Sequence, residues 1–217
     1  MREGILALLT VLAISGTAHA QALLYDPEPP KGSAYIRIAN ATSVPAHAEL
    51  PGGVVDLGAG TADRIGSYQV MENVAGQHIS VEIRAEGEAR ADLVLAPGSF
   101  TTLLLLPGGR SAAMVDETQF NQIRAKLSFY NATDCKVAKL TLGTNGPAIF
   151  EGVTAGTTRM RAVNPVEAQV IASCDGNNAA ELALNGLEAG ARYSIWYLAS
   201  PKPIAFLTRD TTQAWKP

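Results

Sequence analysis

The sequence predicts an all-β protein with two tandem small antiparallel β-sandwich domains of Ig-like size after a cleaved signal peptide. Short runs in which apolar and polar residues alternate are separated by Gly, Pro and Asn-Gly turns. No helical repeat of apolar residues is sustained after residue 20. With 217 residues and 47% hydrophobic content, the chain is long enough for two small domains with separate cores.

Residues 1–20 are predicted to be a signal peptide that is removed on export. Arg2 supplies a basic start, residues 5–14 are apolar, and Ala18–Ala20 fits an A-x-A cleavage site. The mature chain would then begin at Gln21. Because the apolar run is shorter than the roughly 20 residues that cross a bilayer, we expect an exported protein that does not span the membrane after cleavage.

The mature chain is predicted to contain a leader, two sandwiches and a short linker. The leader, residues 21–32, is rich in proline and is expected to be extended. Domain 1 is predicted over residues 33–118 and domain 2 over residues 124–217, with the linker at residues 119–123. Alternating strands are expected at 35–39, 79–84, 91–95 and 111–115, and then at 125–130, 148–153, 168–173, 179–184 and 204–207.

The two predicted domains resemble each other in sequence. Asn40 and Asn131 each end an alternating strand and begin the sequence Asn-Ala-Thr. Asp116 and Asp210 each stand two residues before a Thr, after two apolar strands joined by a turn that contains proline. The offset grows from 91 residues (40 to 131) to 94 residues (116 to 210), as short loop insertions would produce. We therefore predict a tandem duplication.

The chain contains two cysteines, Cys135 and Cys174, both in the second domain. In an oxidising compartment they are expected to form a disulfide, and closing a loop of this length would stabilise the fold by roughly 4 kcal/mol. Two free thiols or a metal pair are the alternatives. His47 and His78, the histidines that remain after cleavage, lie in the first domain, so no metal site is predicted.

No pattern of an enzyme active site is found in the sequence. Ser99 lies outside a G-x-S-x-G elbow, and neither His47 nor His78 has a nearby motif partner. We therefore expect a protein that is not an enzyme, with no catalytic residue, no cofactor and no metal ligand. A net charge of −3 without a cluster of Lys or Arg argues against nucleic-acid binding.

One strand of each domain is apolar on both faces, although an antiparallel sheet commonly has one face in water. These strands are Leu103–Leu106 and its counterpart Trp196–Ala199. The other domain could cover them, or they could form an apolar patch for a partner protein. The candidate partner contacts, which include two residues of the leader, are Tyr25, Lys31, Leu104, Leu106, Trp196 and Tyr197.

The opening of the mature chain, LLYDPEPPKGSAYIRIANAT (residues 23–42), resembles the alginate biosynthesis protein AlgF family. In that family the mature chain opens with a Leu-Tyr-x-Pro and Pro-Lys-Gly-Ser segment, followed by a strand that ends in Asn. The length, export signal and domain plan extend the resemblance over the whole chain. The resemblance implies a periplasmic component of alginate O-acetylation. Such a component would work beside a membrane-bound O-acyltransferase and SGNH-type periplasmic acetyltransferases.

The residues and the resemblance together lead to one hypothesis about function. The chain would be a non-catalytic periplasmic adaptor that bridges membrane and periplasmic acetyltransferase components, so that the exopolysaccharide alginate is O-acetylated. The alternatives are a polysaccharide-binding module and a cryptic acetyltransferase or esterase. The negative net charge argues against recognition of a polyuronate. The aromatic residues that could stack on sugar rings are Tyr193, Trp196, Tyr197 and Trp215.

Overall fold

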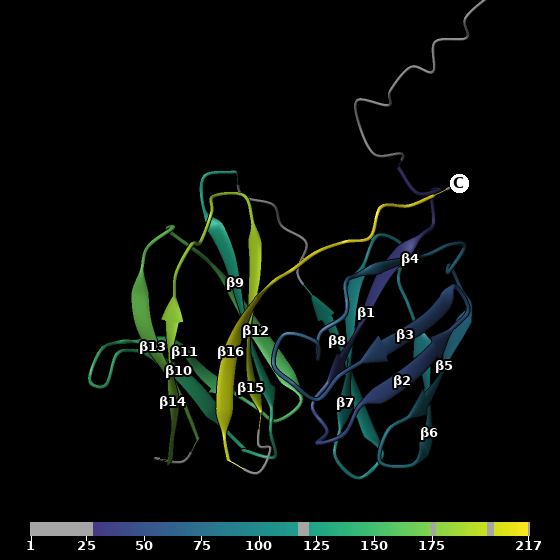
Figure 1. Cartoon of the computed structure of the whole chain (residues 1–217). Coiled ribbons are helices and arrows are strands. Elements are labelled where there is room, and N and C mark those ends of the chain that lie inside the picture. Colours follow the sequence, from purple (N-terminus) through teal and green to yellow (C-terminus); the bar gives the residue numbers. More distant parts are fainter. Residues whose placement is uncertain (1–27, 117–121, 175–176, 199–201, 217) are drawn as a thin grey trace, which may run out of the picture.

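A computed structural model describes residues 28–116, 122–174, 177–198 and 202–216 (Figure 1). All regular elements in these ranges are β-strands, so the all-β prediction is confirmed. Within the same ranges, no helix has the length and apolar character needed to cross a membrane. The predicted signal peptide, the leader up to Pro27 and most of the predicted linker lie outside the described residues.

Strands β1 to β8 form two four-stranded sheets, which we call module 1. Inner sheet 1 has the order β4-β1-β7-β8, and outer sheet 1 has the order β3-β2-β5-β6. The sheets pack face to face and bury an apolar core between them that includes Ile36, Val81 and Leu103. The strands are β1 (Ala34–Asn40), β2 (Ala46–Leu50), β3 (Gly53–Leu57), β4 (Gln69–Met71), β5 (His78–Arg84), β6 (Glu88–Val94), β7 (Phe100–Leu106) and β8 (Arg110–Asp116).

Strands β9 to β16 form two further sheets, which we call module 2. Inner sheet 2 has the order β12-β9-β15-β16, and outer sheet 2 has the order β11-β10-β13-β14. Their core includes Leu127, Phe129 and Ile195. The strands are β9 (Ala125–Ala132), β10 (Ala138–Leu142), β11 (Ala148–Val153), β12 (Thr157–Val163), β13 (Ala168–Cys174), β14 (Asn177–Leu184), β15 (Arg192–Leu198) and β16 (Ile204–Arg209).

The two modules have the same topology, strand for strand, in both of their sheets. This agreement supports the predicted tandem duplication, while the domain bounds stay a prediction. One pair in each module departs from the antiparallel expectation, because β1 runs parallel to β7 and β9 runs parallel to β15. Between these strands the chain passes through the outer sheet twice and through the inner edge strand β4 or β12 once. It then returns to the inner sheet in its original direction, which is how parallel neighbours arise.

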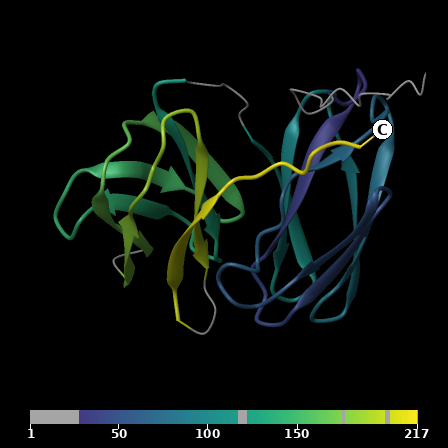
Figure 2. The same ribbon diagram turned by 45° about the horizontal axis from the view of Figure 1, so that its top comes forward.

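The modules pack against each other through their inner sheets, so four sheets lie in the order outer 1, inner 1, inner 2 and outer 2 (Figures 1 and 2). We call the contact between the inner sheets the seam. It has its own apolar cluster, separate from the two cores. Because side chains alternate along a strand, Leu103 and Leu105 of β7 face the core of module 1, whereas Leu104 and Leu106 face the seam.

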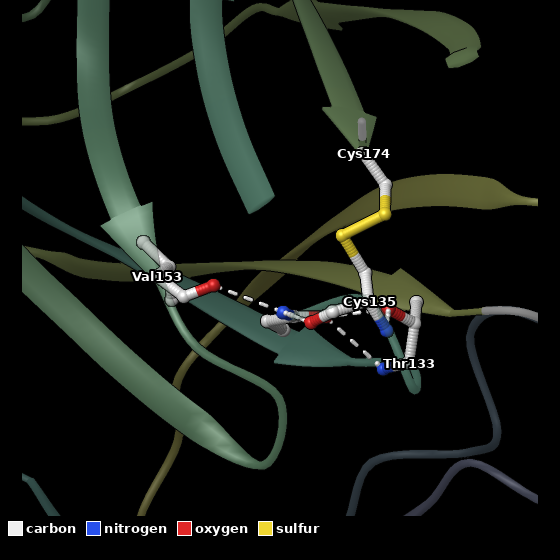
Figure 3. Close-up of a disulfide and its surroundings, with 5 residues drawn as sticks. Thr133, Cys135, Val153 and Cys174 are labelled. Atoms are coloured by element: carbon white, nitrogen blue, oxygen red, sulfur yellow. Dashed lines mark hydrogen bonds between the residues drawn. A yellow bond between two sulfur atoms is a disulfide. The ribbon is translucent and has the colours of Figure 1, made fainter. Parts of the chain in front are cut away.

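The repeated Asn-Ala-Thr sequence forms the same corner in both modules. The side-chain amide of Asn40 donates to the carbonyls of Val44 and Gly58 at 2.8 Å each. Its side-chain oxygen accepts from the backbone amide and the hydroxyl of Thr42. In the same roles, the partners of Asn131 are Cys135, Val153 and Thr133 (Figure 3). Both buried amides use their full bonding capacity, so the repeated sequence has a structural role.

The predicted disulfide between Cys135 and Cys174 is confirmed (Figure 3). The Cα atoms of the two residues are 5.8 Å apart. Cys135 follows β9 of inner sheet 2 and Cys174 ends β13 of outer sheet 2, so the bond ties the two sheets of module 2 together.

Replacing both cysteines by serine is expected to lower the free energy of unfolding by about 2–4 kcal/mol, because the unfolded chain regains the freedom of a closed loop. Urea unfolding of the oxidised wild type and of the C135S/C174S variant would measure this difference. The reduced wild type is the control and should unfold close to the variant. Equal stability of all three proteins would contradict the prediction.

Candidate functional site at the seam between the modules

The seam is lined by apolar side chains that alternate with core residues along the inner strands. A β-strand sends successive side chains to opposite faces, so a sheet buried on both faces must be apolar on both. Each inner sheet is covered by its outer sheet on one face and by the other module on the second face. The buried residues of the apolar seam cluster are Ala39, Ala41, Leu104, Leu106, Met114, Tyr130, Ala132, Trp196, Leu198 and Phe206.

Arg37 of β1 lies at the polar centre of the seam and is buried. Its Nε donates to Thr102 Oγ1 within module 1 at 2.9 Å. Its Nη1 forms an ion pair with Asp210 Oδ1 at 2.6 Å. Its Nη2 donates to Tyr130 Oη at 2.8 Å and to Ser194 Oγ at 3.1 Å. Tyr130 and Ser194 belong to module 2, and Asp210 directly follows its last strand, β16, so a single guanidinium of module 1 joins the two modules.

Asp116 at the end of β8 is a second buried carboxylate in the seam. Its Oδ2 accepts from the hydroxyls of Tyr68 at 2.6 Å and Thr102 at 2.7 Å, and its Oδ1 accepts from the hydroxyl of Tyr130. The Tyr130 hydroxyl thus accepts from Arg37 and donates to Asp116. The cation is therefore linked to one carboxylate directly and to the other through hydroxyl groups, as buried charges require.

Aromatic rings surround the guanidinium group. Its carbon lies 4.4 Å from the ring centroid of Tyr68, 5.0 Å from that of Trp196 and 5.4 Å from that of Tyr130. The Tyr130 and Trp196 rings stack with their centroids 4.1 Å apart, and the Trp196 indole N–H donates to Thr208 Oγ1 at 2.9 Å. These ring faces attract the cation while keeping the surrounding space apolar.

Burial and charge determine the protonation states in the seam. Burial alone would lower the pKa of Arg37, but attraction from Tyr130, Asp210 and the neighbouring acidic groups outweighs it and raises that pKa above its ordinary value. Burial raises the pKa of Tyr68 and of Tyr130, and the positive charge of Arg37 offsets only part of this rise. Arg37 is thus a cation and both phenols are neutral donors at every ordinary pH.

The residues after β16, which we call the strap (residues 210–216), cross from module 2 to module 1 (Figures 1 and 2). The backbone N–H of Tyr68 donates to the carbonyl of Thr211 at 2.8 Å. The backbone N–H of Gln213 donates to the carbonyl of Tyr68, also at 2.8 Å. The Trp215 indole N–H donates to the carboxylate of Glu72 at 2.7 Å. The strap therefore adds a second link between the modules.

The structure corrects the predicted partner contacts on the apolar strands. Leu104, Leu106 and Trp196 are buried in the seam, and Tyr197 is buried in the core of module 2. These side chains are therefore not offered to a partner, because the chain itself already covers both faces of β7 and β15. The alternative expectation, in which the other domain covers these strands, is confirmed.

The other residues singled out in the sequence lie away from the seam centre. Lys31 is exposed before β1, and Tyr25 lies outside the described residues, so both stay predicted partner contacts. His47 on outer sheet 1 pairs with Asp56 at 2.6 Å, whereas the Ser99 hydroxyl is buried just before β7 in inner sheet 1. Within the described ranges, no group of three or more His, Cys, Asp or Glu residues is placed to hold a metal ion.

Sequence reasoning did not identify the polar centre of the seam. A signal for it was present, because Asp116 and Asp210 are the repeated aspartates that end the two related halves. Arg37 was a weaker signal because it is not repeated. It stands three residues before Asn40, and the residue three before Asn131 is Ser128. Two buried aspartates therefore share one arginine, and only the packing of the two modules shows that they do.

Comparison with known proteins identifies the family of the chain. A family model described as alginate O-acetyl transferase AlgF matches residues 6–194, which extend through module 1 and into β15 of module 2. The search of curated proteins found no match to the chain. Because the match covers most of the sequence, and the opening residues resemble the same family, the chain belongs to the AlgF family of alginate O-acetylation.

Proposed function

We propose that this chain is a non-catalytic periplasmic adaptor in the O-acetylation of alginate. Membership of the AlgF family supports the link to that process. The observation that carries the adaptor part is the seam, in which a buried ion pair and the strap hold two similar modules in one orientation. A bridging protein gains from such preorganisation, because it binds two components without first having to order its own domains.

The proposed partners are a membrane-bound O-acyltransferase and SGNH-type periplasmic acetyltransferases. The disulfide supports a location outside the cytoplasm, since such bonds persist in oxidising compartments. The predicted signal peptide points to the periplasm in the same way. The adaptor would hold the membrane component and the polymer-modifying component close together.

A catalytic role is the alternative named by the description of the family, which contains the word transferase. A serine nucleophile needs a base within hydrogen-bond reach. Ser99 immediately precedes β7 of inner sheet 1, whereas His47 lies on outer sheet 1 and bonds to Asp56. We therefore expect an S99A/H47A/H78A variant to support polymer acetylation at the wild-type level in producing cells.

A polysaccharide-binding role would need exposed aromatic rings. Tyr193, Trp196 and Tyr197 are buried, and Trp215 is half-buried with its indole N–H bonded to Glu72. Sugar rings stack on ring faces that are open to solvent, so the aromatic set that suggested this role does not form a platform. The adaptor proposal does not depend on such a platform.

An affinity capture from alginate-producing cells tests the proposed function. Tagged mature chain would be the bait in a gently solubilised envelope extract, with mass spectrometry and a uronic-acid assay as readouts. Enrichment of the acetyltransferase components, equal for the S99A/H47A/H78A variant, is the expected result. Recovery of polymer without these components would favour the polysaccharide-binding alternative. Loss of acetylation in cells that carry the triple variant would favour an enzyme.

A further inference from the structure

We propose that an open apolar hollow in module 2, which we call the end hollow, docks an extended peptide segment of a partner protein. The segment would place a branched aliphatic side chain in the hollow and a carboxylate next to Arg161. This inference rests on the adaptor function, because it assigns one of the adaptor's contacts to a surface. Neither the family match nor the seam assigns a role to this part of the chain.

The end hollow lies between the two sheets of module 2, at the end where β9 begins. Its volume is about 380 Å³, which far exceeds the roughly 10–15 Å³ that is enough to hold one water molecule. The wall is aliphatic apart from one arginine. Its residues include Leu142, Ile149, Arg161, Val163, Val166 and Ala168.

The equivalent end of module 1 is filled by side chains, so the open hollow is a feature of module 2 and not of the shared fold. Leu50 and Leu142 are the last residues of the equivalent strands β2 and β10, yet Leu50 is 8% exposed and Leu142 is 42% exposed. Val74 and Val166 stand three residues after β4 and β12, and their exposures are 0% and 53%. The same fold thus buries an aliphatic pair in one copy and leaves it open to solvent in the other.

Side-chain volume explains the difference. Ile79 of β5 pairs with Leu93 and fills the end of module 1, whereas the register of β13 places Ala168 opposite Leu184 at the equivalent position. An isoleucine is therefore replaced by an alanine at the place where the two sheets would otherwise meet. Unfilled aliphatic surface of this kind is unfavourable in water unless something covers it.

An extended peptide suits the borders of the hollow. The hollow lies beside β11 and β12, which are the edge strands of their sheets within the described part of the chain. Edge strands offer backbone donors and acceptors to an added strand, and alternate side chains of that strand enter pockets between sheets. A flexible lipid chain would use the apolar wall but not these backbone groups.

Charge complementarity adds the acidic part of the proposal. Arg161 of β12 lines the hollow, is exposed, and donates from Nη1 to the carbonyl of Ile149 at 3.0 Å. Its counterpart in module 1, two residues before the end of β4, is the neutral Gln69. A cation is thus present at this position in module 2, beside the open hollow, and absent from the equivalent position in module 1. Beside the hollow, the Arg161 guanidinium would attract a carboxylate on the bound segment.

A methyl NMR titration of the whole mature chain tests the proposal. The probe is the synthetic peptide acetyl-Ser-Val-Leu-Ser-Asp-Ser-amide, in which Leu and Asp stand two residues apart and so point to the same face of an extended strand. Its Leu-to-Asn and Asp-to-Asn versions are the matched controls. Saturable shifts are expected at the methyl groups of Leu142, Val163 and Val166, and not at exposed Val137, which lies outside the hollow. The Leu-to-Asn peptide should bind about 10-fold more weakly, since it loses the buried aliphatic group.

Two variants of the chain separate the apolar and charged parts of the site. Val166→Asp should weaken binding of the peptide about 10-fold, whereas Val137→Asp, at a similarly exposed position, should leave it unchanged. Arg161→Gln should weaken the Asp peptide about 2- to 5-fold and leave the Asp-to-Asn peptide unaffected.

Three results would each overturn the proposal. The first is the absence of saturable shifts at millimolar peptide, and the second is binding of the peptide to the V166D variant with unchanged affinity. The third is binding of decanoate in place of the peptide. The titration uses neither polymer nor acetyl donor. Its failure would therefore remove the docking site and leave the adaptor function to be judged by the affinity capture.

Discussion

Replacing Arg37 by alanine is expected to lower the free energy of unfolding by about 3–5 kcal/mol, because removal of one partner leaves a buried charge uncompensated. The carboxylate of Asp210 would lose its ion-pair partner at 2.6 Å, and the hydroxyls of Tyr130 and Ser194 would each lose a donor. Urea unfolding followed by circular dichroism measures the loss. The fluorescence of buried Trp196, which lies 5.0 Å from the guanidinium, should report opening of the seam.

An exposed ion pair supplies the matched control for Arg37. Arg84 and Glu49 pair at 3.1 Å on outer sheet 1, where their side chains are 59% and 43% exposed. Arg84→Ala should cost less than about 1 kcal/mol, because water screens such pairs. If R37A were as stable as R84A, the seam would not depend on its buried cation. A variant R37A/D210A, which removes both charges, should recover part of the lost stability.

Replacing Trp196 by alanine should also lower the free energy of unfolding by about 3–5 kcal/mol, since a large buried ring leaves a cavity that the sheets fill only in part. The ring stacks on Tyr130 at 4.1 Å and donates to Thr208 at 2.9 Å. Its neighbours in the seam cluster come from both modules, so the loss should appear as weaker contact between them. Small-angle X-ray scattering of the variant should show a larger radius of gyration than the wild type.

The other tryptophan is the matched control, because the substitution is chemically the same. Trp215 lies in the strap, is half-buried and bonds to Glu72 at 2.7 Å. Trp215→Ala is expected to cost about 1 kcal/mol, the usual value of one hydrogen bond with modest burial. Equal costs for W196A and W215A would contradict the prediction, because the seam would then contribute no more than the strap.

The sequence was sufficient for those features that depend on local pattern. Strand alternation predicted the all-β class, and the Asn-Ala-Thr repeat pointed to the corner that Asn40 and Asn131 form in both modules. Cys135 and Cys174 were predicted to pair from the predicted export of the chain. Short strands were harder, because β4 has three residues, too few to establish an alternation.

The features that depend on packing between distant strands could not be predicted from pattern. An apolar strand such as Leu103–Leu106 fits a partner surface and a strand covered by a second sheet equally well. Only the contact of the two inner sheets decides between them. Likewise, Arg37 fits the solvent-facing position of an alternating strand. It is buried because it pairs with Asp210, which is 173 residues away in the sequence. The parallel pairing of β1 with β7 is equally invisible along the chain.

The adaptor proposal and the stability predictions for Arg37 and Trp196 depend on one property of the molecule: the two modules form a single rigid body through the seam and the strap. Backbone residual dipolar couplings of the mature chain in a dilute aligned medium test this property most directly. One alignment tensor is expected to fit the couplings of β1 to β8 and of β9 to β16, in the relative orientation that Figure 1 shows. Two different tensors, with a smaller magnitude for one module, would show independent motion and contradict the rigid seam.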